Sequence, residues 1–322
     1  MPQFSEAEYQ VLVIVHRATM RKLPTTLTGL RSLGMDKIGD ALENWDMAIE
    51  RLTRDGLLEH KDGSYALTVS GQKAAEETST SHPIPRYFYN EYYRRAEHSA
   101  AHGEFCRRVY GADLCQHGMA SMSQVQVMVD LLRLTANDTV IETGCGNGMI
   151  TEYISDQTGA HVTGVDIADG AIAGARLRTA DKNRRLSFAI ANLNGLDFPP
   201  GSFDVYVCID SLYFVRDLET AIDQAVAMVK PEGRMALFWE AWTADECRQL
   251  PDILHKRHLS FTTHDFSEEA RQHWQKKREV LEELRSRFAD EDNMFLFNNR
   301  MDEVNGIAGA ELIDRKLYFV TP

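Results

Sequence analysis

Short apolar runs and segments of helical periodicity alternate through the second half of the chain. Residues 139–141 and 161–166 are typical of buried strands, and residues 149–154 carry apolar side chains at helical intervals. Two further runs, 205–209 and 235–239, have the same strand-like character. Strands that alternate with helices predict an α/β fold with a parallel sheet.

The first part of the chain, residues 1–80, has a different pattern that predicts a separate, mostly helical unit. Apolar side chains recur at helical intervals over 9–16 and over 38–52, where Leu42 is one of them. Residues 54–68 then predict a β-hairpin, because they contain the turn-forming pair Asp-Gly. The proline-punctuated stretch 78–85 marks a linker, so the second domain is predicted to run over 86–322.

A glycine-rich turn follows the strand at 139–141, with the sequence Glu-Thr-Gly-Cys-Gly-Asn-Gly over 142–148. Glycines at alternate positions let the backbone turn tightly and approach a ligand that a Cβ would exclude. Asp166 lies 166 − 148 = 18 residues beyond the last glycine, the spacing of a carboxylate that holds ribose hydroxyls. A nucleoside site is expected, but not one for NAD, because Met149 stands where a dinucleotide fingerprint has its third glycine.

This turn resembles motif I of class I S-adenosylmethionine (SAM) dependent methyltransferases, an acidic residue followed by Gly-x-Gly-x-Gly. Three further segments agree with the family in order and spacing: 196–204, the strand at 205–209, and the turn at 230–234. The resemblance covers about 86–322. It implies a Rossmann-like α/β domain whose seven-stranded sheet has an antiparallel last strand.

The resemblance also implies which residues bind SAM. The glycine turn would pass under the methionine part, Asp166 would accept both ribose hydroxyls, and Asn192 would accept a hydrogen bond from the adenine amino group. Asn192 departs from the family, which usually has Asp there. The thiol in the turn is expected to be packed and inert. The full predicted set is Glu142, Gly144, Cys145, Gly146, Gly148, Asp166, Ile167, Asn192, Leu193 and Asp210.

The segment from Tyr110 to Met119 resembles the Tyr-Gly…His-x-Gly loop that borders SAM and the acceptor in several small-molecule methyltransferases. His117 is the first candidate for a base or orienting group, because imidazole accepts a proton near neutral pH; a structural role is the alternative. Tyr110 and Tyr213 are the other candidate catalytic residues. The nearby cysteines and histidines match no standard metal spacing, so no metal is expected.

Some candidate substrate residues come directly after predicted strands, at the edge where open parallel sheets bind ligands. Others belong to the aromatic cluster that opens the second domain. An aromatic box with a carboxylate would suit a cationic amine or sulfonium, whereas Arg300 would suit an acid. The sequence leaves both open. The candidates are Tyr87, Tyr92, Phe214, Glu240, Trp242 and Arg300.

The last part of the domain is predicted to carry a helical insertion around 243–292 that acts as a lid. Its charged residues, such as Lys276 and Lys277, are interpreted as a solvated face. Residues 295–297 and 316–320 are predicted to form the last two strands, an antiparallel hairpin.

The first unit, helices followed by a hairpin, resembles a winged helix, and residues 52–71 are similar to the wing of MarR-type regulators. A DNA reader needs a basic face, but residues 1–80 hold 9 Lys/Arg and 12 Asp/Glu, a balance of 9 − 12 = −3. Winged helices also serve as dimerisation modules in many small-molecule methyltransferases. A dimerisation or lid domain is therefore the preferred interpretation.

The net charge of −13 argues against a protein that lives on nucleic acid or an anionic membrane. The longest apolar run near the start, 11–15, is far shorter than the roughly 20 residues of a membrane span. Since nothing resembles a signal peptide or a membrane span, a cytoplasmic location is expected. The five cysteines are odd in number and contain no Cys-x-x-Cys pair, so a disulfide scaffold is not expected.

The leading hypothesis is a homodimeric SAM-dependent methyltransferase that acts on an O, N or S atom of a small molecule. The alternative is a winged-helix transcription regulator with a SAM-sensing, non-catalytic domain. A methyltransferase acting on RNA or protein is disfavoured, because Asp210-Ser211-Leu212-Tyr213 stands where an Asn/Asp-Pro-Pro-Tyr/Phe motif would follow the fourth strand.

Overall fold

A computed structural model describes residues 4–39 and 44–321. The chain divides into two compact units between Tyr92 and Tyr93. No helix among these described residues is long and apolar enough to cross a membrane.

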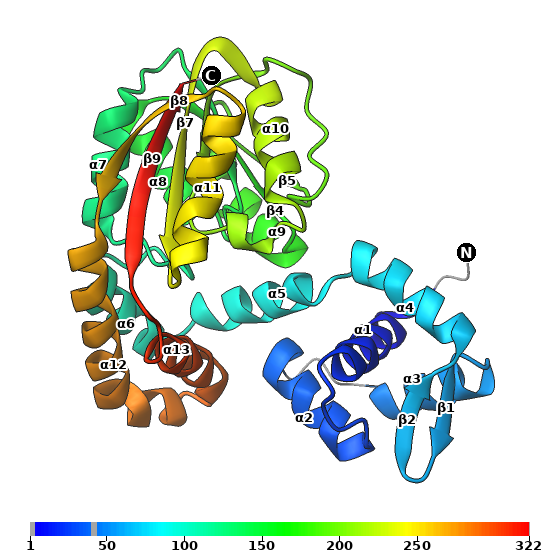
Figure 1. The fold of residues 1–322 in the computed structure, drawn as a ribbon. Helices are drawn as coiled ribbons and strands as arrows, with labels where there is room; N and C mark the ends of the chain where they lie inside the picture. The colour runs from blue at the N-terminus through cyan, green and yellow to red at the C-terminus, as the bar shows by residue number, and fades with distance from the viewer. Residues whose placement is uncertain (1–3, 40–43, 322) are drawn as a thin grey trace. The chain divides into compact units, whose positions relative to one another are not determined.

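The first unit places three helices before a β-hairpin and one after it (Figure 1). The helix that follows, α5 (Ile84–Ala96), continues past the boundary between the units. The elements of the first unit are α1 (Glu6–Met20), α2 (Leu27–Ile38), α3 (Trp45–Arg54), β1 (Leu58–Lys61), β2 (Ser64–Leu67) and α4 (Val69–Ser81).

The predicted hairpin is confirmed. Strands β1 and β2 pair in antiparallel register, and Lys61 lies opposite Ser64. The two turn residues between them, Asp62 and Gly63, have φ of +52° and +76°. Positive φ at both positions is what a two-residue hairpin turn of the right twist requires.

Two predictions for this region are wrong. A single helix over 38–52 is interrupted, because α2 ends at Ile38, the following Gly39 has a φ of +75° that is not helical, and α3 begins only at Trp45. Leu42 lies outside the described residues. The predicted linker at 78–85 is mostly helical, since α4 runs to Ser81 and α5 begins at Ile84. The Thr78 and Ser79 hydroxyls donate to backbone carbonyls one turn earlier, which satisfies these polar groups without ending the helix.

The second unit is a sheet of seven strands in the order β5-β4-β3-β6-β7-β9-β8. Strands β3 to β7 pair in parallel, and β9 is antiparallel to both of its neighbours. This confirms the predicted seven-stranded sheet with an antiparallel last strand. The strands are β3 (Thr139–Thr143), β4 (His161–Asp166), β5 (Leu186–Ile190), β6 (Phe203–Cys208), β7 (Val229–Ala241), β8 (Ser260–Asp265) and β9 (Asp314–Thr321).

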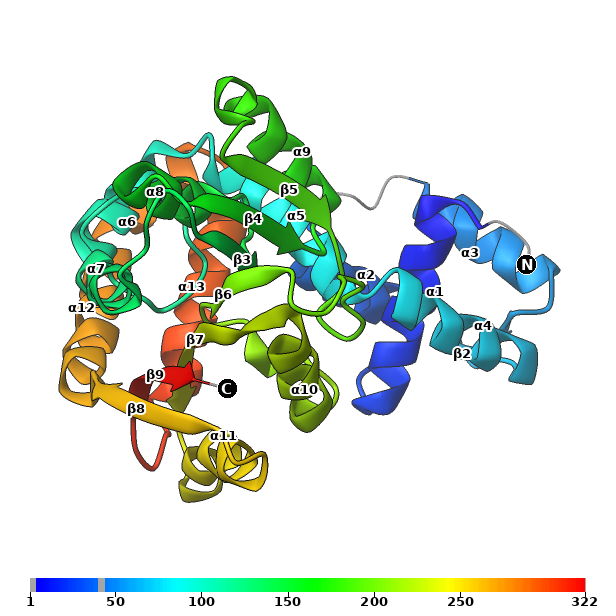
Figure 2. The ribbon, with the colours of Figure 1, turned by 90° about the horizontal axis from the view of Figure 1, so that it is seen from above.

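Helices cover both faces of the sheet, as Figure 2 shows for α7 and α8 on one side and α10 and α11 on the other. Successive side chains of β3 alternate between the faces: Val140 packs in the core under α7, α8 and α9, and Ile141 in the core under α10 and α11. The helices are α6 (Ala100–Tyr110), α7 (Met122–Leu132), α8 (Met149–Thr158), α9 (Asp169–Arg178), α10 (Leu218–Met228), α11 (Ala244–Lys256), α12 (Ser267–Asp290) and α13 (Met294–Ile307), with short 3₁₀ turns η1 (Ala180–Lys182) and η2 (Leu212–Phe214).

The predicted last hairpin is half wrong. Residues 295–297 lie in α13, and the strand that pairs with β9 is instead β8. All but one of the β8 residues are exposed, so the strand has no apolar alternation to reveal it. The helix predicted within the insertion around 243–292 is present as α12, but the inserted pair of helices between β8 and β9 extends through α13, and β8 within the predicted range belongs to the sheet.

The interpretation of the insertion's charges as a solvated face is wrong for Lys277. Its side chain is fully buried, pairs with Glu303 at 2.6 Å and lies 4.3 Å from the centroid of the Trp274 ring. Position 277 therefore belongs to the buried face of α12, in line with Trp274 and Leu281.

Candidate functional site

The glycine turn leaves the carboxyl end of β3 and enters α8. Gly144 has φ +72° and Gly146 has φ +56°, values that favour glycine. A Cβ on Gly144 would lie 2.0 Å from Ser211 Oγ, and a Cβ on Gly146 would lie 2.0 Å from the Tyr93 hydroxyl. Both the turn and the close approach of neighbouring side chains therefore require the absence of a side chain.

A small cavity of about 40 Å³ adjoins this turn. It brings together four of the residues predicted from the sequence, namely Glu142, Gly144, Cys145 and His117. Three polar lining residues, Tyr93, Gln116 and Asn147, were not among the predicted site residues. Asn147 lies in the glycine turn and Gln116 in the loop before His117, but these motifs do not tell which of their polar side chains face the cavity. The full lining is Tyr93, Leu114, Gln116, His117, Gly118, Ala120, Glu142, Gly144, Cys145, Asn147, Ile150 and Ile209.

Glu142 is buried beneath the turn and accepts a hydrogen bond of 2.5 Å from Thr151 Oγ1. Burial raises the pKa of Glu142 to about 7, since the ionised form loses its hydration, and the nearby Asp166 carboxylate adds to the rise. Cys145 is buried as well, and burial raises the pKa of its thiol well above the usual range, as in a packed, unreactive cysteine.

Asp166 ends β4 beside the turn. One carboxylate oxygen accepts a hydrogen bond from the backbone N–H of Gly146 at 2.8 Å, and the other accepts from Ala168 at 2.9 Å. These bonds orient the carboxylate. Asp166 itself is not among the residues that line the small cavity. Leu193 lies 3.9 Å from the position of a Cβ on Gly144, whereas the Asn192 side chain accepts hydrogen bonds from Asn194. Ile167 follows Asp166 directly, and Gly148 packs against Phe188 rather than lining the cavity.

The Nε2 atom of His117 lies 3.1 Å from Asn299 Oδ1 and 3.3 Å from Glu303 Oε1. Both partners are acceptors, so Nε2 carries the proton. Burial and the neighbouring Arg300 guanidinium lower the pKa of His117 to about 3. A neutral imidazole with so low a pKa is a poor proton acceptor, and the structure therefore favours the orienting role over the base.

The other two candidate catalytic tyrosines do not line the cavity. Tyr110 is buried against the ring of His273, with centroids 5.1 Å apart, and burial raises the pKa of its hydroxyl. Tyr213 stacks on Trp239 at 4.8 Å, and its hydroxyl accepts a hydrogen bond from the backbone N–H of Glu240. Both contacts are those of core side chains.

The Asp210 carboxylate, predicted to contact the cofactor, is hydrogen-bonded and ion-paired within the protein. Its Oδ2 accepts hydrogen bonds from the backbone N–H groups of Met119 at 2.6 Å and Ala120 at 3.0 Å, and its carboxylate pairs with Arg315. Asp210 therefore fastens the loop that carries Gln116 and His117.

Two of the candidate substrate residues are likewise engaged within the core. Glu240 accepts hydrogen bonds from the indole nitrogens of Trp274 at 2.7 Å and Trp242 at 3.1 Å, and it pairs with Arg315. A carboxylate so engaged does not form the box for a cation that the sequence left open. Arg300, fully buried on α13, donates to the backbone carbonyls of Gln116 and His117 at 2.6 and 2.7 Å, so a role in binding an acid is not supported.

The remaining substrate candidates, Phe214, Trp242, Tyr87 and Tyr92, are not among the residues that line the cavity. Phe214 is 48% exposed in η2. Tyr87 and Tyr92 belong to the first unit, and their role in substrate binding stays a prediction.

Residues 141–237 match the family described as "Methyltransferase domain". The chain is 33% identical over 97 residues to ubiquinone biosynthesis O-methyltransferase of Idiomarina loihiensis, and 33% identical over 112 residues to 27-O-demethylrifamycin SV methyltransferase of Amycolatopsis mediterranei. These matches cover 30% and 34% of this chain, and 40% and 41% of those proteins. The chain thus spans less than half the length of these curated relatives.

Solved structures share the fold. Phosphoethanolamine N-methyltransferase 2 of Haemonchus contortus, in complex with S-adenosyl-L-methionine, has a TM-score of 0.57 at 14% identity, over 72% of this chain and 59% of that one. The [4+2]-cyclase SpnF has a TM-score of 0.53 at 17% identity, over 64% of this chain and 83% of that one. Because these two proteins have different activities, the shared fold does not by itself determine the reaction.

Proposed function

We propose that this protein is a SAM-dependent methyltransferase that moves a methyl group to an O, N or S atom of a small molecule. The observation that carries the proposal is the glycine turn between Glu142 and Asp166, inside the segment that matches a methyltransferase domain. The curated relatives named above are both methyltransferases of small molecules by their names, which supports the acceptor class.

The residues of the turn fit the cofactor. A Cβ would fill the space beside Gly144 and Gly146, and Asp166 presents two oxygens at the end of β4. Asp166 would accept the ribose hydroxyls, Glu142 would face the amino group, and Ile167, Asn192 and Leu193 would border the adenine. When bound, the cofactor supplies a methyl group on a sulfonium, so a neutral thioether leaves.

The remaining task of the chain is to hold the acceptor in line with the methyl group and to exclude water. His117 suits this task as a neutral, fixed group, because its Nε2–H is held by Asn299 and Glu303. Its low pKa favours an acceptor that is already nucleophilic when it binds.

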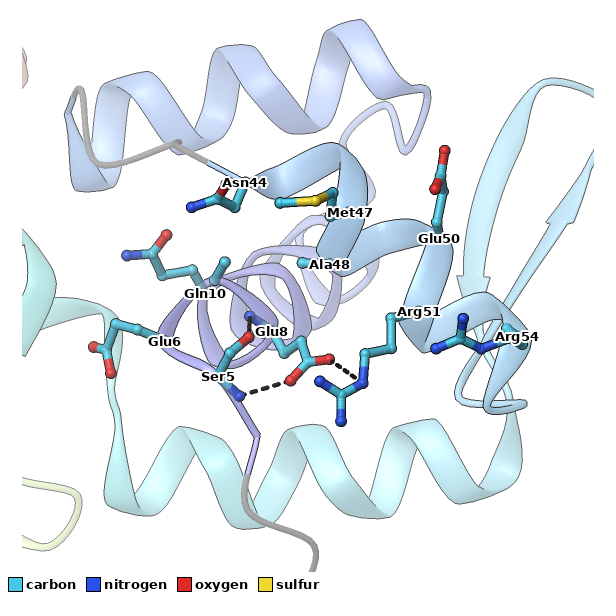
Figure 3. Close-up of a pocket in the computed structure, with 11 residues that line it drawn as sticks. Ser5, Glu6, Glu8, Gln10, Asn44, Met47, Ala48, Glu50, Arg51 and Arg54 are labelled. Carbon is cyan, nitrogen blue, oxygen red and sulfur yellow. Dashed lines mark hydrogen bonds and ion pairs between the residues drawn. The ribbon is translucent and has the colours of Figure 1, made fainter.

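We also propose that the first unit is a winged-helix-like domain through which two copies of the chain associate. A hollow of about 900 Å³ lies between the start of α1 and α3, and Figure 3 shows Glu6 and Arg54 on its opposite sides with Met47 between them. Met47 is 62% exposed. The lining of the hollow mixes Glu6, Glu8 and Glu50 with Arg51 and Arg54, so a twofold pair would bring carboxylates of one copy toward guanidinium groups of the other.

The exposed side of α3 supports association over DNA reading, because its exposed charges balance: Asp46 and Glu50 offset Arg51 and Arg54, whereas a DNA reader needs an excess of cations. A Met47→Glu variant should shift the protein from dimer to monomer in sedimentation velocity, whereas Val69→Glu, at a position 92% exposed outside the hollow, should not. A monomeric wild-type protein would refute the dimer.

A cytoplasmic location completes the proposal. All five cysteines are unpaired thiols, as is usual in a compartment where glutathione keeps thiols reduced.

Calorimetry with SAM and S-adenosylhomocysteine tests the function. Wild-type protein should bind both, and Asp166→Ala should weaken binding about 100-fold, because a half-buried carboxylate that would accept two hydroxyls is lost. Asp197→Ala, an exposed carboxylate, is the matched control. Absence of binding to the wild-type protein would end the assignment; binding would justify a screen of thioether, amine and hydroxyl acceptors for transfer of a labelled methyl group.

A further inference from the structure

The small cavity beside the glycine turn has a carboxylate in its lining but no side chain that is a permanent cation. Glu142 lines it, and none of its lining residues is Lys or Arg. An α-amino acid group, which carries an ammonium and a carboxylate on one carbon, would find an acceptor for the ammonium in Glu142. Its carboxylate would depend on neutral donors.

Gln116 is the lining side chain with a donor to spare. It is 5% exposed, and its Oε1 accepts a hydrogen bond from the backbone N–H of Leu114 at 3.2 Å, which fixes the orientation of the amide. Its Nε2 is buried and has no hydrogen-bond partner among the residues that the structure describes. A buried donor left unpaired costs free energy, so a ligand that accepts from it gains affinity.

Two neighbouring side-chain donors, those of Asn147 and His117, are already engaged. Asn147 Nδ2 donates to Glu97 Oε1 at 2.9 Å, and His117 Nε2 donates to Asn299. The backbone of Gln116 is itself fixed, because Arg300 donates to its carbonyl at 2.6 Å. The amide is therefore held in place at the cavity rather than free to turn away.

We infer that Gln116 Nε2 donates to the carboxylate of the ligand's α-amino acid group and makes the site selective for adenosyl ligands that carry this carboxylate. The inference rests on the proposed function and deepens it. It assigns Gln116, outside the glycine motif, as a specificity-determining residue opposite Glu142.

The test compares two ligands on three proteins by calorimetry. S-adenosylhomocysteine carries the carboxylate, and decarboxylated S-adenosylmethionine keeps the ammonium but lacks the carboxylate. Gln116→Leu should weaken S-adenosylhomocysteine about tenfold or more, the effect of losing a hydrogen bond to a charged group, and leave the decarboxylated ligand within about twofold. Gln116→Glu should weaken S-adenosylhomocysteine further, because it sets a second anion against the carboxylate, and should not weaken the decarboxylated ligand.

The decarboxylated ligand also reports whether each variant keeps a folded site, since its affinity depends on the same turn and on Asp166. Gln275→Leu, on the exposed side of α12, is the control for a surface amide. Equal effects on both ligands, or none on S-adenosylhomocysteine, would overturn the inference while leaving the cofactor assignment intact. Failure of the wild-type protein to bind either ligand would instead refute the proposed function.

Discussion

The carboxylate of Asp210 accepts hydrogen bonds from both terminal nitrogens of the Arg315 guanidinium, at 2.9 and 3.1 Å. Both residues are buried, and Asp210 has φ +54°, a conformation that non-glycine residues rarely adopt. Because Asp210 also accepts from the backbone of Met119 and Ala120, the pair connects β9 to the loop at the cavity. The strained residue is thus held by charge from a strand distant in the sequence.

We predict that Arg315→Met lowers the free energy of unfolding by about 3–5 kcal/mol, because it leaves the carboxylates of Asp210 and Glu240 buried without their cation. Urea denaturation at pH 7 measures the change. Arg248→Met is the control: its partner Asp245 is 88% exposed and Arg248 is 64% exposed, so the cost should be below about 1 kcal/mol. Equal costs for the two variants would contradict a structural role for the buried pair.

Gly146→Ala should abolish binding of S-adenosylhomocysteine and destabilise the fold by about 1–3 kcal/mol, because a Cβ would meet the Tyr93 ring at a positive φ. Thermal unfolding and calorimetry measure the two effects. Gly195→Ala is the control, since no heavy atom lies within 4 Å of its Cβ position and its φ is not positive. Normal binding by Gly146→Ala would show that the turn does not need this close approach.

The sequence was sufficient to predict four of the five parallel strands, β3, β4, β6 and β7, together with the glycine turn and Asp166, because local patterns determine them; β5 was not predicted. A strand that is buried on both faces has a continuous apolar run, and a turn with positive φ at alternate positions favours glycine at those positions. Strand β8 escaped prediction because an exposed edge strand has no apolar side to mark it, and 295–297 was misassigned because so short an apolar run does not distinguish a strand from a helix.

The polar neighbours of the site could not be predicted, because contacts between distant segments determine them. Arg300 reaches the loop at 116–117 across 184 residues of sequence, and Arg315 reaches Asp210 across 105. Charged side chains are normally exposed, so Lys277 and Glu240 looked like surface residues or ligand contacts. Only the three-dimensional pairing shows that these charges satisfy one another.

His117 should stay neutral and keep its proton on Nε2 from pH 5 to pH 8. Burial and Arg300 lower its pKa to about 3, and the acceptors Asn299 and Glu303 select this tautomer. Nitrogen-15 NMR of labelled imidazoles measures both properties. A His117 signal that titrates near pH 6.5 would contradict the buried, neutral assignment.

Glu142 should make the stability of the ligand-free protein depend on pH between about 4.5 and 7. Its folded-state pKa of about 7 lies above its usual value of 4.5, so the folded state binds the proton more tightly than the unfolded state does. The stabilising contribution of the protonated form is complete below pH 4.5 and is lost as the pH rises to 7. Glu142→Gln removes this dependence while keeping a carbonyl oxygen for Thr151.

Urea denaturation of the wild type and of Glu142→Gln at pH 4.5 to 8 measures the difference in their free energies of unfolding. The contributions of the other titrating groups cancel in this difference. The stability of Glu142→Gln relative to the wild type should rise with pH by on the order of 3 kcal/mol and level off above pH 7. A difference that does not change with pH would place the pKa of Glu142 at its ordinary value. Binding of S-adenosylhomocysteine by the wild type should strengthen over the same interval, because an ionised Glu142 attracts the ligand's ammonium and the protonated form does not.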